Sequence, residues 1–532
     1  MKFSRCLRFV ACVVVQAFAG TFFANAQFAI TTHHYDNHRT GWNRHEAVLT
    51  PSNVNAASFG LLQIVTLDAQ VDGQPLVVPG VIITAGGFPG THDVVYVATE
   101  NNTIYAIDAE SGTVLLSPNF GPPVSSPTIC GVSPAIGIHS TPVIDLSSST
   151  MYVLIYTNDL TGPAYRLHAL DLGSLSDKVV PQLVAASHLL TDGTTLAFNA
   201  LYQRQRPALL LANGNVYSAF GAFCDGQANF ARGWLMGWTT GTLTPLTTGE
   251  LIDMQAASPD NYFLSSIWTS GAGPAADDFG NLLFVTGNSQ YLTYDGVTNI
   301  QESVVKVSST LSSVTDLFTP ADQDSLDLSD NDFGSGGVMI LPDQPGVMRH
   351  LAVAAGKEGS MFLMNEDNLG GHSSKNKVLG TYSIGGCWCG ESYFVDPSDG
   401  AARVVSSGGR SIKVWKLHTS PAPSLTLVSS SSAIGGGQSQ GFFTSVSSNG
   451  SANPIVWALS HPVPGLGSVM NLYAFDPEAK GSALKPIFQS PAGTWPNPQN
   501  NSNQVPVVAN GRVFVASSGQ LQIFGLLGSG KK

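Results

Sequence analysis

The fold of this chain is decided by one stretch, VVYVATENNTIYAIDAESG at residues 94–112. Two runs of β-branched and aromatic residues, 94–99 and 103–108, flank the turn Asn101-Asn102, and a second polar turn follows Asp108. Short runs of this composition on either side of a tight polar turn are typical of antiparallel strands. The stretch therefore predicts a β-hairpin and the start of a third strand.

The same hairpin pattern occurs eight times. The copies lie at residues 94–108, 150–171, 215–238, 282–286, 350–364, 403–415, 455–476 and 512–524. A further strand with a proline or small-residue start precedes most copies, as at residues 141–144, 206–210, 273–276 and 505–508. Each repeat is therefore expected to form a four-stranded antiparallel sheet.

Such a sheet has apolar residues on both faces and is not stable alone, so the units must pack on one another. Radial closure covers the faces and shortens the exposed edges, and about 63 residues per unit suit one blade with long loops. We therefore predict an all-β fold, an eight-bladed β-propeller of four-stranded antiparallel blades, with a seven-bladed ring as the alternative. The run 59–65 is expected to complete the last blade and close the ring.

Composition excludes several classes of protein. Of 532 residues, 43% are hydrophobic and 11% charged, which excludes a disordered chain or a coiled coil. The 56 glycines and 31 prolines indicate many tight turns. A net charge of −12 opposes binding to nucleic acid.

The N-terminus has the pattern of an export signal. Basic residues precede an apolar run at residues 9–23, and Ala24-Asn25-Ala26 is a small-residue cleavage site. We expect a signal peptide at 1–26, an N-terminal extension at 27–58, the propeller at 59–527 and a flexible tail at 528–532. The mature chain would be secreted or periplasmic, with no transmembrane segment, because no later run of about 20 apolar residues occurs. Lipid attachment at Cys12 is the alternative.

Four cysteines remain after the leader, and four cysteines allow three pairings. Cys387 and Cys389 are close in sequence, so a disulfide between them would be a strained ring. We expect each to pair instead with Cys130 or Cys224. Metal binding by the two thiolates would need further ligands.

Several motifs resemble a known family, the pyrroloquinoline quinone (PQQ) type β-propellers that include the quinoprotein alcohol dehydrogenases. The repeat at 96–112 resembles the repeat of that family. Further segments that resemble secreted bacterial members lie at residues 35–41, 206–211, 267–277 and 356–359. The resemblance covers nearly the whole chain after the leader.

The resemblance implies a PQQ site with calcium. In the quinone-dependent members adjacent cysteines form a disulfide over the cofactor, a Trp stacks beneath it, and Glu, Asn and Asp serve a calcium ion and the catalytic base. This chain departs from that pattern, because its nearest feature is Cys387-Trp388-Cys389 in the sixth repeat. The Cys-x-x-Cys-His motif for haem attachment does not occur in the sequence.

Candidate site residues lie in the loops that lead into the innermost strand of each blade, since these loops converge on one mouth of a propeller. They include His139-Ser140, Arg206, residues 268–270, Asp332, residues 387–391, residues 438–440 and Asn503. Their side chains suit a polar, planar or sugar-like ligand. We expect the cofactor to contact Arg206, Trp268, Ser270 and His139, the base to be Asp332 or Glu391, and Asp330 and Asp332 to bind a metal.

Two other clusters have less specific patterns. Five aspartates at 322, 324, 327, 330 and 332 suggest calcium, but the spacing is not that of an EF-hand, and a solvated acidic loop is the favoured interpretation. His33, His34 and His38 could bind a transition metal, but an exposed N-terminal tail is favoured.

Three functions are compatible with these residues. The leading hypothesis is an exported propeller that binds a small polar ligand or glycan at the channel mouth. The second is a PQQ-dependent oxidoreductase of alcohols or sugars with PQQ and Ca²⁺ as cofactors. The third is a platform for protein interactions that uses the blade faces.

Overall fold

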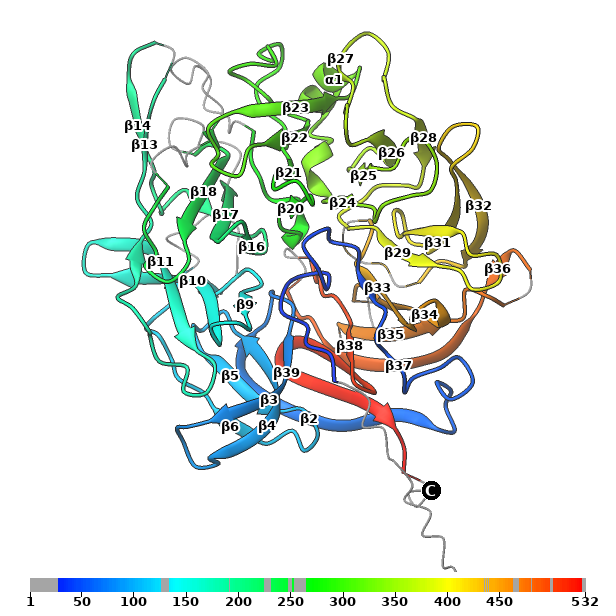
Figure 1. The fold of residues 1–532 in the computed structure, drawn as a ribbon. Helices are drawn as coiled ribbons and strands as arrows, with labels where there is room; N and C mark the ends of the chain where they lie inside the picture. The colour runs from blue at the N-terminus through cyan, green and yellow to red at the C-terminus, as the bar shows by residue number, and fades with distance from the viewer. Residues whose placement is uncertain are drawn as a thin grey trace, which may run out of the picture.

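The computed structural model describes residues 27–125, 134–190, 192–223, 231–246, 251–252, 265–434, 436, 438, 440–462, 468–479, 481–497 and 501–528. Eight β-sheets follow one another in chain order around a common axis, as the colours of Figure 1 show. This ring confirms the predicted eight-bladed propeller. Among the described residues no helix is long and apolar enough to cross a membrane.

Blades one to four form the first half of the ring. Blade one holds β3 (Leu76–Ile83), β4 (Gly90–Ala98), β5 (Ile104–Asp108) and β6 (Val114–Leu116). Blade two holds β9 (Val143–Asp145), β10 (Thr150–Asp159), β11 (Gly162–Asp171) and β12 (Gln182–Leu183). Blade three holds β16 (Leu210–Ala212), β17 (Asn215–Ala222), β18 (Trp234–Thr239) and β19 (Leu251–Ile252), with β15 (Gln203–Arg204) on β17. Blade four holds β20 (Ala275–Ala276), β21 (Leu282–Val285), β22 (Val304–Val307) and β23 (Val314–Thr319), with β27 (Gly371–His372) outside.

The second half completes the ring. Blade five holds β24 (Val338–Ile340), β25 (Leu351–Ala355), β26 (Ser360–Asn365) and β28 (Gly380–Ser383). Blade six holds β29 (Ser392–Val395), β30 (Ala402–Ser406), β31 (Lys413–His418) and β32 (Ser424–Ser431), with β36 (Ala483–Leu484) outside. Blade seven holds β33 (Thr444–Asn449), β34 (Ala452–Leu459), β35 (Val469–Phe475) and β37 (Pro486–Thr494), with β1 (Trp42–Asn43) inside. Blade eight holds β38 (Val507–Ala509), β39 (Arg512–Leu526) and β2 (Phe59–Gln70).

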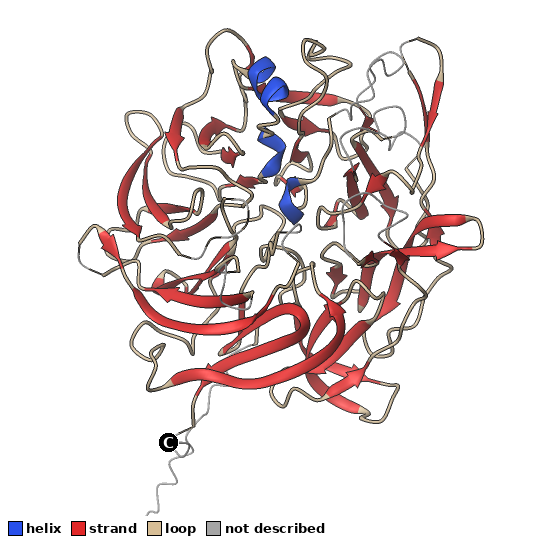
Figure 2. Cartoon of the chain, turned by 180° about the vertical axis from the view of Figure 1, so that it is seen from behind, coloured by secondary structure: helices blue, strands red, loops and turns tan. Residues whose placement is uncertain are grey.

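A few short elements lie outside the blades. Two small hairpins are β7 (Val124–Ser125) with β8 (Ala135–Ile136), and β13 (Ser187–Leu189) with β14 (Thr195–Ala197). The helical stretches of the described chain are η1 (Thr269–Gly271), α1 (Gln323–Ser329) and η2 (Phe333–Ser335). Figure 2 shows these three in blue, one after another between the edge and the middle of the ring.

The hydrophobic core lies between neighbouring blades because side chains of a strand alternate between its two faces. In β4, Val95 packs in a cluster with Phe514 of blade eight. The next residue, Tyr96, packs in a different cluster with Met151 of blade two. Each blade is therefore buried on both faces only when its neighbours are present.

The ring closes through the two ends of the chain. Strand β2 pairs antiparallel with β39, with Phe59 opposite Leu526 and Gln70 opposite Ser518. This pairing confirms the predicted closure of the last blade by the strand near residue 59.

The segment from Ile30 to Asn43 contacts the innermost strand of every blade, and it is the dark blue trace near the middle of Figure 1. The contacted residues, from blade one to blade eight, are Val77, Ile144, Leu211, Ala276, Ile340, Tyr393, Val446 and Val508. His33 and His34 are each 2% exposed. The expectation of an exposed tail at these two histidines is therefore wrong, because this segment fills the centre of the ring.

Candidate functional site

Trp268 and the charged side chains around it form the centre of the candidate site. Trp268 precedes blade four, Arg206 precedes blade three, and Lys357 lies in the turn between β25 and β26 of blade five. The Arg206 Cζ atom is 5.6 Å from the centroid of the Trp268 ring, and Lys357 Nζ is 5.5 Å from it. Lys357 Nζ is also 5.6 Å from the Trp388 ring of blade six. Residues from blades three, four, five and six therefore meet here.

The guanidinium of Arg206 has no hydrogen bond or ion pair within the described residues, and it lies over the Trp268 ring. Burial, followed by the nearby charge of Arg204, lowers the pKa of Arg206 to about 9. The side chain is half-buried, so this cation is available to an anionic group at the mouth.

Asp332 is 2% exposed and forms an ion pair with Lys357. Its Oδ2 atom lies 2.5 Å from Lys357 Nζ, and its Oδ1 accepts a hydrogen bond from the Asn288 backbone N–H at 2.9 Å. Burial raises the pKa of Asp332, and the ammonium of Lys357 opposes this shift. Lys357 also pairs with the exposed Asp330 at 3.1 Å.

A second polar network lies beside Arg206 and is centred on His139. Nδ1 of His139 contacts Glu100 Oε1, while Arg204 donates to Nε2 at 2.7 Å. Burial, followed by the charges of Arg204 and Arg206, holds the pKa of His139 well below its usual range. The imidazole is therefore neutral, with its proton on Nδ1 shared with Glu100. Burial and the neighbouring Asp72 raise the pKa of Glu100 well above its usual range.

Cys387 and Cys389 form a disulfide with each other, with a Cα–Cα distance of 4.9 Å. The expected pairing of each with Cys130 or Cys224 is therefore wrong; the latter two cysteines lie outside the described residues. The intervening turn is held by backbone hydrogen bonds from Cys387 N to Gly356 O at 3.0 Å and from Trp388 N to Gln440 O at 2.9 Å. These bonds to neighbouring loops bring the two sulfurs together.

Glu391 lies next to this disulfide and is 1% exposed. Both carboxyl oxygens are buried without a hydrogen-bond partner in the described part of the chain. One of them lies within 4.8 Å of both sulfur atoms. Burial raises the pKa of Glu391 to about 7.

Ser270, Gln440 and Gln438 have structural contacts, whereas neither side-chain polar atom of Asn503 has a hydrogen-bond partner among the described residues. Ser270 is fully buried and donates to the carbonyl of Ser335 at 2.6 Å, which ties blade four to blade five. Gln440 Oε1 accepts a hydrogen bond from Gly386 N at 3.2 Å. Gln438 Oε1 accepts one from Ser502 N at 2.9 Å.

The acidic loop is only partly solvated. Asp327 and Asp332 are 3% and 2% exposed, and residues 323–329 form helix α1. The prediction of a solvated loop is wrong for these two side chains, because α1 turns Asp327 toward the interior of blade four.

Sequence reasoning missed four residues of this region, namely Asp72, Glu100, Arg204 and Lys357. Lys357 belongs to the segment 356–359 that carried the family resemblance, so a signal for it was present. Asp72, Glu100 and Arg204 had no such signal, because their roles depend on contacts between blades one, two and three.

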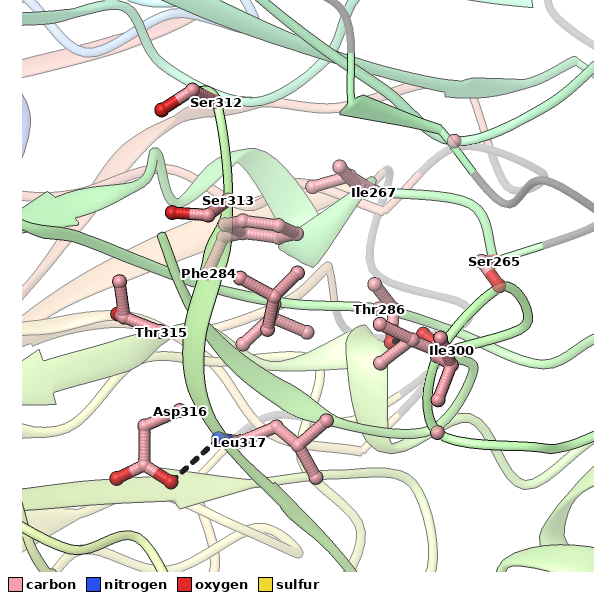
Figure 3. Close-up of a pocket in the computed structure, with 15 residues that line it drawn as sticks. Ser265, Ile267, Phe284, Thr286, Ile300, Ser312, Ser313, Thr315, Asp316 and Leu317 are labelled. Atoms are coloured by element: carbon pink, nitrogen blue, oxygen red, sulfur yellow. Dashed lines mark hydrogen bonds between the residues drawn. The ribbon is translucent and has the colours of Figure 1, made fainter. Parts of the chain in front are cut away.

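A cavity of about 520 Å³ lies on blade four beside blade three. Figure 3 shows its apolar lining, which includes Ile267, Phe284, Ile300 and Leu317. The carboxylate of Asp316 accepts a hydrogen bond from the Leu317 backbone N–H at 2.8 Å. This lining does not suit a polar ligand.

Comparison with known proteins gives a clear result at the level of the fold. Neither a protein-family model nor a curated protein sequence matches the chain. The quinohemoprotein alcohol dehydrogenase from Comamonas testosteroni is similar in structure, with a TM-score of 0.60 and 13% identity over 95% of this chain and 81% of that chain. A europium-containing methanol dehydrogenase has a TM-score of 0.59 and 10% identity over 94% of this chain and 98% of that chain.

A quinohemoprotein alcohol dehydrogenase from Pseudomonas putida is also similar, with a TM-score of 0.56 and 13% identity over 94% of this chain and 81% of that chain. At such low identity the likeness shows the fold. The chain therefore shares its overall fold with these dehydrogenases, and its function must be argued from its own site.

Proposed function

We propose that the mouth of this propeller binds PQQ and that the protein oxidises a small alcohol or sugar. The proposal rests on one observation, the unpaired guanidinium of Arg206 stacked on Trp268 with a second cation, Lys357, beside the same ring. An indole face flanked by cations suits a planar aromatic ligand that carries several carboxylates. The fold shared with quinohemoprotein alcohol dehydrogenases supports this assignment.

The residues fit the two proposed cofactors differently. Trp268 would stack on the PQQ ring system, and Arg206 would pair with a PQQ carboxylate. A calcium ion between Asp330 and Asp332 does not fit these contacts, because the ammonium of Lys357 pairs with both carboxylates. Metal binding by Asp330 and Asp332 therefore stays a prediction.

PQQ, when bound, supplies an acceptor for two electrons. In the chain itself, Asp332 would accept the proton of the substrate hydroxyl at Oδ2. Burial raises the pKa of this carboxyl, which favours proton uptake by a general base, while Lys357 stabilises its ionised form.

Export also remains a proposal. The leader-like residues 1–26 support it, and a disulfide between Cys387 and Cys389 suits an oxidising compartment.

The test is titration of the purified protein with PQQ, followed by tryptophan fluorescence and absorbance, and then dye-linked oxidation of a panel of alcohols and sugars. We expect one PQQ per chain. Arg206→Gln should weaken binding by about 10- to 100-fold, since a charged hydrogen bond is lost. Arg349→Gln is the matched control, because the Arg349 side chain is 59% exposed.

Asp332→Asn separates binding from turnover. It should leave PQQ uptake measurable and lower the rate by about 10²- to 10⁴-fold. Failure of the wild-type protein to take up PQQ would defeat the proposal. Uptake without oxidation of any substrate would favour the alternative in which the mouth only binds a small polar ligand or glycan.

A further inference from the structure

A second group of buried acids lies in blade four, between the loop that joins β21 to β22 and helix α1. Asp327 on α1 accepts hydrogen bonds from Ser289 N at 2.9 Å and from Gln301 Nε2 at 3.3 Å. Glu302, next to Gln301, accepts a hydrogen bond from Phe333 N at 2.5 Å. Glu302 and Asp327 are 0% and 3% exposed.

Three oxygen atoms in this group are buried without a hydrogen-bond partner among the described residues. They are Glu302 Oε1, Ser289 Oγ and Gln301 Oε1. All three residues are 0% exposed. Buried polar atoms are normally hydrogen-bonded. Three unpaired oxygen atoms beside two carboxyl groups therefore indicate that a positively charged partner, such as a metal ion, binds here.

The charges of Glu302 and Asp327 also indicate a missing cation. Within the described chain neither Glu302 nor Asp327 has an ion pair, and the nearby cation, Lys357, is engaged by Asp330 and Asp332. Burial, and then Asp332 and Asp327, raise the pKa of Glu302 well above its usual range. Burial raises the pKa of Asp327 to about 8. Two buried carboxyls without a cation must hold protons or bind a metal ion.

We propose that this group is a binding site for a divalent cation of the calcium type, with Glu302, Asp327, Ser289 and Gln301 as ligands. Carboxylate, hydroxyl and amide oxygens are the ligands that hard cations prefer. A half-turn of the Gln301 amide exchanges its nitrogen and oxygen and brings Oε1 toward Asp327. The site does not use Trp268 or Arg206, so it does not depend on the proposed binding of PQQ.

The ion would link elements that frame the mouth. Glu302 accepts from the backbone N–H of Phe333, the residue directly after Asp332. Asn288, directly before Ser289, donates its backbone N–H to Asp332. A cation held by Glu302, Ser289 and Asp327 would therefore fix the backbone on both sides of Asp332.

The experiment uses the full-length mature protein without PQQ, treated with EGTA and then titrated with CaCl₂ by calorimetry. We expect one calcium ion per chain and a rise in Tm of roughly 2–4 °C at 100-fold excess over Kd. Glu302→Gln and Asp327→Asn should each weaken calcium binding at least tenfold. Asp322→Asn is the matched control, because Asp322 is exposed and makes no side-chain capping bond.

Two results would overturn the proposal. The first is the absence of calcium uptake and of any Tm shift, which would mean that the two carboxyls hold protons. The second is uptake that Asp332→Asn abolishes but Glu302→Gln and Asp327→Asn do not, which would place the ion at the mouth. Ser289→Ala provides a milder variant if the carboxyl variants do not fold. Arg206→Gln should bind calcium like wild type, which separates this test from that of the proposed function.

Discussion

Replacing Arg39 by methionine should destabilise the whole ring. The Arg39 side chain connects the segment from Ile30 to Asn43, here called the central segment, to two blades. Its guanidinium donates to the carbonyl oxygens of Pro274 at 3.0 Å, His33 at 2.9 Å and Leu209 at 3.2 Å, and to Thr32 Oγ1 at 2.7 Å. Methionine keeps the approximate length of the side chain and removes all of these donors.

The magnitude follows from two opposing effects. Each of the three buried carbonyls loses a charged donor at a cost of about 1–3 kcal/mol, or about 6 kcal/mol together. Burial lowers the pKa of Arg39 to about 10 from 12.5, so removing the buried charge returns about 3 kcal/mol. The free energy of unfolding should therefore fall by about 3 kcal/mol.

Guanidinium unfolding of wild type and Arg39→Met, followed by circular dichroism, measures this change. The midpoint should fall while the slope stays the same. Arg44→Met is the matched control, because Arg44 is exposed and directly follows this segment. A midpoint for Arg39→Met equal to that of the control would refute the idea that the central segment holds the blades together.

Three further predictions follow from the closure of the ring, the disulfide and the buried acid beside it. A chain that ends before Val505 lacks β38 and β39, leaves β2 unpaired and should be insoluble or unfolded; a soluble chain with a cooperative transition would contradict this. Mass mapping of the non-reduced protein should find Cys387 and Cys389 in one peptide that is lighter by two hydrogen atoms, and a link from either to Cys130 or Cys224 would contradict the structure. Burial raises the pKa of Glu391 from 4.5 to about 7, so the folded chain binds the extra proton and stability falls as pH rises through this window, by up to about 3 kcal/mol. Glu391→Gln should therefore be more stable than wild type at pH 8 with little difference at pH 4, as denaturant midpoints at the two pH values will show.

The candidate site was only partly predictable from the sequence. Arg206, Trp268 and Asp332 were predicted because each lies in a loop that enters an innermost strand, and the structure brings them to one mouth. Lys357 contacts Trp268, Trp388 and Asp332, but it was missed because it lies in the turn between β25 and β26. Loop position in a repeat indicates which residues can converge, but the identity of each partner depends on contacts between blades.

Two errors have the same physical origin. The disulfide between Cys387 and Cys389 was rejected on the basis of spacing, yet hydrogen bonds from other loops fold the turn so that the sulfurs meet. The histidines at 33 and 34 were expected in an exposed tail, yet each is 2% exposed. Their environment is supplied by the blades around them.

The sequence by itself determined the hairpins, the number of blades and the closing strand, because alternation of side chains and turn residues act within a few neighbouring positions. Only the tertiary structure decided that Arg206 stacks on Trp268 without a carboxylate partner, and that Glu302 and Asp327 are buried together in blade four. Those properties arise from desolvation and from electrostatic interactions between segments that are far apart in the chain. A local sequence pattern cannot predict them.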